Sequence, residues 1–177
     1  MLDESRVNEA EKNVRVYIEE GLLRRVPAAD RHILEVAWNN CRESLNVAGV
    51  LQESNHSSLW TVVCSYYSMY YAASAVLYKQ GYKVGPKIPH KVTSDALIVY
   101  VRGKLRDSLL EDYDSARDEA LDIAGLKADE IIGLFDSERS KRSRFQYSMT
   151  ESVKSQKAVT SLERAKRFVF ELEKLLG

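Results

Sequence analysis

Apolar residues recur every three or four positions along most of the chain, which is the spacing of one face of an α-helix. Asp30 and Ser57 or Ser58 stand where N-caps are expected, and Gly81 stands where a helix prefers a left-handed residue after its last turn. No segment alternates with period two for long, so the pattern does not indicate a strand. It predicts helices over about 6–25, 30–52, 57 or 58 to 80, 90–101, 105–123, 129–147 and 151–176. We therefore predict an all-α fold, an antiparallel up-and-down helical bundle.

The length of 177 residues fits one domain with a core that needs neither disulfides nor metal. We expect a single domain over 1–177, with the helix at 6–25 packed on the bundle and an enlarged connection at about 102–137. Helix boundaries are hardest to place in that connection, because it is acidic and modestly apolar. Its sequence assigns no role to the acidic residues Glu111, Asp112, Asp114, Asp118, Glu119 and Asp122.

Charge is balanced, with 26 lysines and arginines against 26 aspartates and glutamates, so the chain offers no uniform positive field to nucleic acid. An anionic partner would need a local patch, and the segment SERSKRSRFQY contains one. On a helix, Arg139 and Arg142 can share a face and form a small phosphate site, with Arg144 nearby. The alternative is a solvated helix end.

Cys41 and Cys64 have neither C-x-x-C spacing nor a nearby histidine pair, so we expect buried free thiols, no metal site and no cofactor. The N-terminal residues lack the apolar core of a signal peptide, and no window approaches the roughly 18 apolar residues that span a bilayer. We expect a soluble, cytoplasmic protein with no membrane partner.

The stretch SYYSMYYAASAVLY at 65–78 carries five tyrosines in one predicted helix. Helical spacing predicts that Tyr67, Tyr71 and Tyr78 point into the bundle, while Tyr66 and Tyr70 lie toward the side. Two interpretations stay open. All five rings can belong to the core with their hydroxyls at its rim, or the surplus ring surface can pack against a second protomer.

The longer stretch YYSMYYAASAVLYKQGYKVGPKIPH resembles the central signature of the HEPN superfamily (higher eukaryotes and prokaryotes nucleotide-binding domains). That signature is a tyrosine- and alanine-rich helix, a glycine, and a loop ending in histidine, here His90. The resemblance extends to YIEEGLLRRV, ILEVAWNNCRESLNVAGVL, RSRFQY and SLERAKRFVFELEKLL. It implies a helical bundle, commonly a homodimer, with a nucleotide- or RNA-binding cleft between protomers. His90 would contact the ligand there, whereas its alternative role is to cap the next helix.

Catalytic HEPN members place an arginine, then a histidine four to six residues later, in the segment that resembles RSRFQY, and the pair cleaves RNA without metal. In this chain Arg142 is followed by Gln146 and Tyr147 at those positions. A phenol with a pKa near 10 is a poor general base at neutral pH. We therefore expect no efficient nuclease of the family type, and the sequence assigns no catalytic residue.

Three hypotheses follow. The first is a homodimer that binds nucleotide or RNA phosphate. The second is a protein-interaction subunit, or a toxin–antitoxin component, paired with a minimal nucleotidyltransferase that can modify Tyr147. The third is a weak, metal-independent RNase that uses His90. In the first, the phosphate-binding residues are Arg139, Arg142, Arg144 and Tyr147, and the cleft or dimer interface contains Tyr66, Tyr70 and His90.

Overall fold

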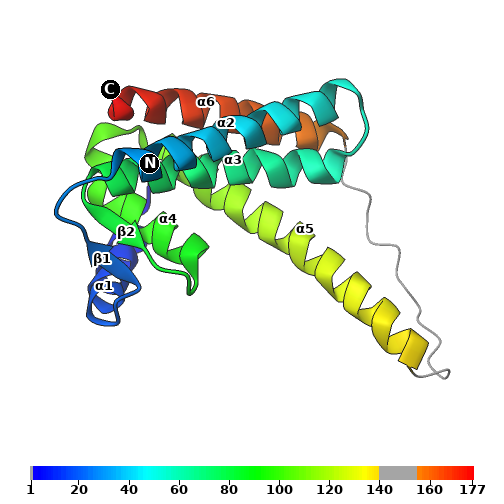
Figure 1. The fold of residues 1–177 in the computed structure, drawn as a ribbon, viewed down its shortest axis with the longest axis horizontal. Helices are drawn as coiled ribbons and strands as arrows, with labels where there is room; N and C mark the ends of the chain where they lie inside the picture. Colours follow the sequence, from blue (N-terminus) through cyan, green and yellow to red (C-terminus); the bar gives the residue numbers. More distant parts are fainter. Residues whose placement is uncertain (1, 140–154) are drawn as a thin grey trace.

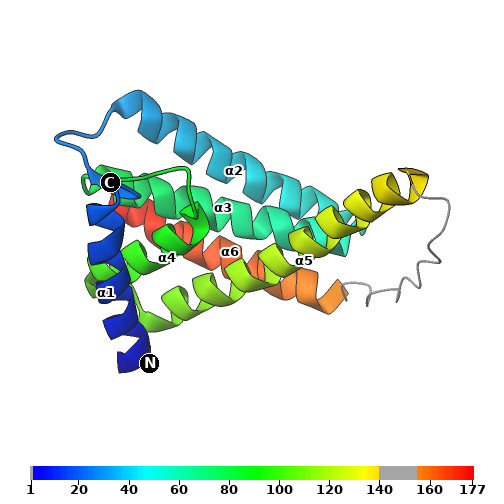
Figure 2. The ribbon, with the colours of Figure 1, turned by 90° about the horizontal axis from the view of Figure 1, so that it is seen from below.

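The computed structural model describes the backbone of residues 2–139 and 155–177 and the side chains of 2–125 and 155–177. The described residues form six α-helices, one short 3-10 helix and a two-stranded sheet, which confirms the all-α prediction. Figure 1 shows the elements in chain order, and Figure 2 shows α1 lying across one end of the bundle. The elements are α1 (Glu4–Glu19), β1 (Leu23–Arg25), α2 (Arg31–Glu53), α3 (Ser58–Lys79), β2 (Tyr82–Val84), α4 (Pro89–Tyr100), η1 (Arg102–Lys104), α5 (Asp107–Arg139) and α6 (Ser155–Leu176).

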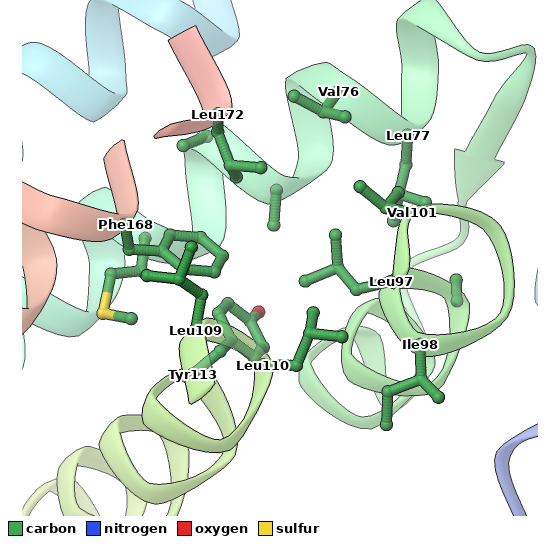
Figure 3. Close-up of a cluster of buried hydrophobic side chains, with 14 of the residues drawn as sticks. Val76, Leu77, Leu97, Ile98, Val101, Leu109, Leu110, Tyr113, Phe168 and Leu172 are labelled. Atoms are coloured by element: carbon green, nitrogen blue, oxygen red, sulfur yellow. The ribbon is translucent and has the colours of Figure 1, made fainter. Parts of the chain in front are cut away.

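Helix α3 is the centre of the fold, because α2, α4, α5 and α6 all pack against it. Its residues Ala72, Ala73 and Ala75 are fully buried, and their small side chains allow neighbouring helices to approach closely. Figure 3 shows how side chains of α3, α4, α5 and α6 meet in the core. Those labelled there are Val76, Leu77, Leu97, Ile98, Val101, Leu109, Leu110, Tyr113, Phe168 and Leu172.

The first predicted helix ends earlier than its apolar pattern indicated. Helix α1 stops at Glu19, and Gly21 has a φ of 69°, a left-handed conformation that glycine adopts easily. The next residues form strand β1, in which Leu23 pairs with Val84 of β2 in an antiparallel ladder. The prediction of helix to residue 25 was wrong because this pairing joins segments far apart in the sequence.

The predicted break between the fifth and sixth helices is also absent, because α5 is one continuous helix over Asp107–Arg139. Gly125 lies inside it, and a glycine in a helix interior costs about 1 kcal/mol relative to alanine without necessarily ending the helix. Figure 1 shows α5 leaving the bundle at an angle. The predicted start of the last helix, at 151, lies outside the described residues.

The acidic residues of α5 now have a structural role: they join α5 to its neighbours. The guanidinium of Arg164 on α6 lies 3.2 Å from a carboxylate oxygen of Asp112 and 3.7 Å from one of Glu119. Lys157 also contacts Glu119, at 4.0 Å. These pairs are partly exposed, so each contributes modestly, but together they fix how α5 lies along α6.

Candidate functional site

Three of the residues predicted to line a cleft or interface, Tyr66, Tyr70 and His90, lie together in the structure. The ring centroid of His90 is 4.7 Å from that of Tyr70 and 5.5 Å from that of Tyr66. Tyr67 joins them, with its centroid 5.8 Å from His90 and nearly perpendicular to it. We call these four residues the tyrosine–histidine cluster. Tyr71 extends it along α3, 5.5 Å from Tyr70.

The predicted orientation of these tyrosines is partly wrong. Tyr66 is fully buried, whereas Tyr67, Tyr70 and Tyr71 are half-buried. Tyr78 is buried as expected. Periodicity within α3 cannot show that α5 covers a second side of the helix, where the Tyr66 ring lies 5.9 Å from the ring of Tyr113.

The loop before α4 places His90 against α3. Ile88 has a left-handed φ of 43°, and Pro89 occupies the first turn of α4, where its missing N–H costs nothing. His90 Nδ1 lies 2.7 Å from the hydroxyl oxygen of Tyr66. The helix start has no side-chain cap, so the alternative role of His90 as a cap is not found.

Electrostatics keep His90 neutral near physiological pH. Burial and the positive charge of Arg117 on α5 both lower the pKa of His90 below its ordinary value. In one neutral tautomer of the imidazole, Nδ1 accepts a hydrogen bond from the Tyr66 hydroxyl. In the other tautomer, Nδ1–H donates to the hydroxyl oxygen. In either one, Nε2 makes no hydrogen bond to the part of the chain that the structure describes.

The phenols of the cluster remain protonated. Burial raises the pKa of Tyr66 and, to a smaller extent, the pKa of Tyr70. Tyr113 is completely buried beside them, and this burial raises the pKa of its phenol well above the ordinary value. The tyrosines therefore offer ring faces and hydroxyl dipoles, while His90 is the group in the cluster whose ordinary pKa lies closest to neutral pH.

Arg117 is a site residue that the sequence did not single out. Its guanidinium donates to Asp114 at 3.0 Å and to Asp118 at 2.8 Å, which holds it in place beside the cluster. Its side chain is 16% exposed, so it still reaches solvent. In the sequence it is one basic residue in an acidic stretch, and only the packing of α5 against α3 and α4 brings it near His90.

A buried carboxylate is connected to Arg117 through Arg6 and Asp114. Asp95 is 1% exposed and accepts hydrogen bonds from Arg6 at 2.6 Å, Tyr17 at 2.9 Å and Asn13 at 3.0 Å. Arg6 also donates to Asp114 at 3.2 Å, and Asp114 in turn binds Arg117. The network joins α1, α4 and α5. In the sequence, the only indication of this network was an aspartate within the apolar run DALIVY.

The predicted phosphate-binding residues stay a prediction, because their side chains lie outside the described part of the chain. Arg139 is the last residue of α5, and its side chain is not described. Arg142, Arg144 and Tyr147 lie outside the described residues. Along α5, Arg139 is about 33 Å from Arg117, from the helical rise of 1.5 Å per residue.

A separate open groove of about 560 Å³ lies between α2 and the end of α6. Trp38 and Leu34 supply apolar surface, and Arg42, Lys79 and Glu173 supply charge. Lys79 donates a hydrogen bond to the carbonyl of Leu176 across it. This mixed lining has no convergent set of donors that would select a ligand.

The chain matches no protein-family model and gives no significant match to a curated protein. Within residues 2–139 and 155–177, no helix combines the length and apolar character needed to cross a membrane. Among the side chains that are described, at 2–125 and 155–177, no three or more histidine, cysteine, aspartate or glutamate groups cluster so that they could hold a metal ion. Cys41 and Cys64 are free thiols, the first buried and the second partly buried.

Proposed function

We propose that the chain is a HEPN-like helical domain that binds nucleotide or single-stranded RNA at the tyrosine–histidine cluster. The observation that supports this is the grouping of half-buried tyrosine rings around a neutral imidazole, with the Arg117 guanidinium beside them. Aromatic faces next to a cation are how proteins bind unpaired bases and their phosphates. The all-helical fold is the one that the sequence resemblance implies.

The tyrosine rings and the arginine would contact different parts of the nucleotide. Tyr67, Tyr70 and Tyr71 present rings on which bases can stack, and each such stack contributes about 1–3 kcal/mol. Arg117 donates from Nε and Nη2 to Asp118 and from Nη1 to Asp114, which leaves one N–H on each terminal nitrogen that can donate to a phosphate oxygen.

Two parts of the proposal rest on the resemblance alone. In the first, Arg139, Arg142, Arg144 and Tyr147 contact phosphate beyond the cluster. In the second, a second protomer completes the cleft.

The test is fluorescence anisotropy of labelled single-stranded RNA with Tyr70→Leu and Tyr70→Phe. We expect Tyr70→Leu to weaken binding about tenfold or more, because one stacking ring is lost, and Tyr70→Phe to retain most of the affinity. Tyr100→Leu is the control, since Tyr100 is half-buried and stacks on Tyr82, outside the cluster. Equal losses in all three variants, or no RNA binding by the native chain, would contradict the proposal.

Arg142→Ala tests the basic segment separately. If that segment contacts phosphate, the variant binds RNA more weakly and with a smaller dependence on salt, because fewer counterions are released on binding. Unchanged affinity and salt dependence would remove Arg142 from the site and leave the cluster as the tested surface.

A weak metal-independent RNase is a second candidate. It is favoured by the Nε2 atom of His90, which has no partner in the described chain, and by the positive charge of Arg117, which acts on the His90 imidazole. His90 would accept the proton of a ribose 2′ hydroxyl while its oxygen forms a bond to phosphorus. The P–O5′ bond breaks as that leaving oxygen takes up a proton from solvent water, and Arg117 stabilises the added negative charge.

Incubation with RNA in EDTA tests this candidate. Cleavage to cyclic-phosphate ends that is lost in His90→Asn, with RNA binding retained, supports it. Intact RNA with the native chain contradicts it and leaves the binding proposal standing.

A further inference from the structure

Helix α2 carries a second apolar stripe on the side away from the core. Its inner face buries Cys41 and Ala48, whereas four large apolar side chains on the other side stay exposed. They are Ile33 at 38%, Val36 at 43%, Val47 at 39% and Val50 at 56%. We call these four residues the outer stripe. They account for four of the eleven exposed large apolar residues in the described chain, and all lie on one helix face.

The spacing of the outer stripe is that of a helix-pairing seam. Positions 33, 36, 40, 43, 47 and 50 alternate steps of three and four, which keeps them on one side of a helix that packs along a partner helix. The two middle positions hold Asn40 and Glu43. Neither side chain has a hydrogen bond or an ion pair within the described residues. The seam runs for about 26 Å, from the rise of 1.5 Å per residue.

The pattern is palindromic. If a second α2 is laid antiparallel with its midpoint between residues 41 and 42, Ile33 meets Val50 and Val36 meets Val47. At the middle, Asn40 meets Glu43. A two-fold interface needs this self-complementarity, because each contact between residues i and j is repeated as one between j and i. Matching apolar pairs therefore fill both ends of the seam.

Charge selects the antiparallel direction. In a parallel pair, Glu43 would face Glu43 of the second copy, and like charges in contact are unfavourable. In the antiparallel pair, the Asn40 amide can donate to the Glu43 carboxylate of the second copy. The flanking residues Ala37 and Ser44 are small and uncharged, which permits close approach.

We infer that the outer stripe of α2 docks, antiparallel, on the same stripe of a second copy of this chain. This interface is distinct from the protomer contact that the resemblance implies at the cleft. It does not depend on the proposed RNA binding, since the stripe shares no residue with the tyrosine–histidine cluster. Two helices alone make a small interface, so the dimer dissociates at micromolar concentrations.

Analytical ultracentrifugation of the full chain over roughly 1 to 200 μM tests the inference. We expect reversible dimerisation that Val47→Glu weakens tenfold or more, because a buried carboxylate faces Val36 of the second copy. Val16→Glu is the matched control, since Val16 is a 41% exposed valine on α1. Its association should equal that of the native chain. A monomer across the whole range, or equal loss in both variants, would overturn the inference.

Asn40→Lys tests the direction of the helices. The antiparallel arrangement places the new ammonium beside Glu43 of the second copy, so the dimer becomes severalfold tighter at low salt, and the gain disappears at high salt. In a parallel arrangement two lysines would face each other and the dimer would weaken, which would overturn the proposed geometry. Loss of RNA binding in Tyr70→Leu with the dimer intact would separate this interface from the RNA site.

Discussion

Helices α2 and α3 have nearly the same length and pack side by side, yet they differ in what surrounds them. Helix α3 buries 13 of its 22 residues, whereas α2 buries 2 of its 23. One helix is enclosed by the rest of the chain, and the other presents apolar side chains to solvent. The difference teaches that stability is concentrated around α3, while α2 presents the surface that we propose for a second copy of the chain. Substitutions in the two regions should therefore have very different effects.

The largest contrast is between two carboxylates. We expect Asp95→Ala to lower the free energy of unfolding by about 3–5 kcal/mol, because it leaves Arg6 and Tyr17 without their buried acceptor. Glu35→Ala removes an exposed pair with Arg31 on α2 and should cost less than about 0.5 kcal/mol. Urea denaturation of both variants measures the difference, and similar losses would show that the Asp95 network contributes little.

Apolar truncation gives the next largest contrast. Met69→Ala empties a fully buried position of α3 and should cost about 2–5 kcal/mol. Val47→Ala removes two exposed methyl groups from α2 and should change stability by no more than about 0.5 kcal/mol when measured below the concentration of dimerisation. A cost above 1 kcal/mol for Val47→Ala in the monomer would show that α2 is less exposed than described.

Substitution of the N-cap residue should lower stability by a similar amount in α2 and in α3, in contrast to the two pairs above. Asp30 accepts from the N–H of His32 at 2.8 Å at the start of α2, and Ser57 accepts from that of Trp60 at 3.3 Å at the start of α3. Each alanine substitution should cost about 1 kcal/mol, because a cap is a local interaction and does not depend on how buried the rest of the helix is. Thermal melts of both variants check this.

The smallest effect is the dependence of stability on pH at His90. Burial and Arg117 lower its folded pKa below 6.5, so the unfolded chain binds the proton more tightly. The stabilisation is complete above pH 6.5 and is lost as the pH falls through the lowered folded pKa. Between about pH 7.5 and about pH 5.5, the native chain should therefore lose more stability than His90→Asn, as measured by urea titration. Equal losses would mean that His90 titrates normally.

Local features were predictable from the sequence, and features that depend on distant segments were not. The caps at Asp30 and Ser57 and the left-handed Gly81 follow from the residues of one turn, and the structure has all three. Tyr70 and His90 were placed together only through a resemblance. Arg117 was missed because nothing in its neighbourhood distinguishes it from a solvated arginine.

The β1–β2 pairing has a consequence for the order of folding. Leu23 and Val84 meet across the whole α2–α3 hairpin, so joining them from an open chain would cost about 3.6 kcal/mol of loop-closure entropy, before any constant term. Docking of α2 on α3 first shortens that loop, and the sheet can then form at little further cost. We expect a substitution in β1, such as Leu23→Ala, to accelerate unfolding much more than it slows refolding, as stopped-flow kinetics can measure. We therefore expect the two-stranded sheet to form late, on a hairpin that is already assembled.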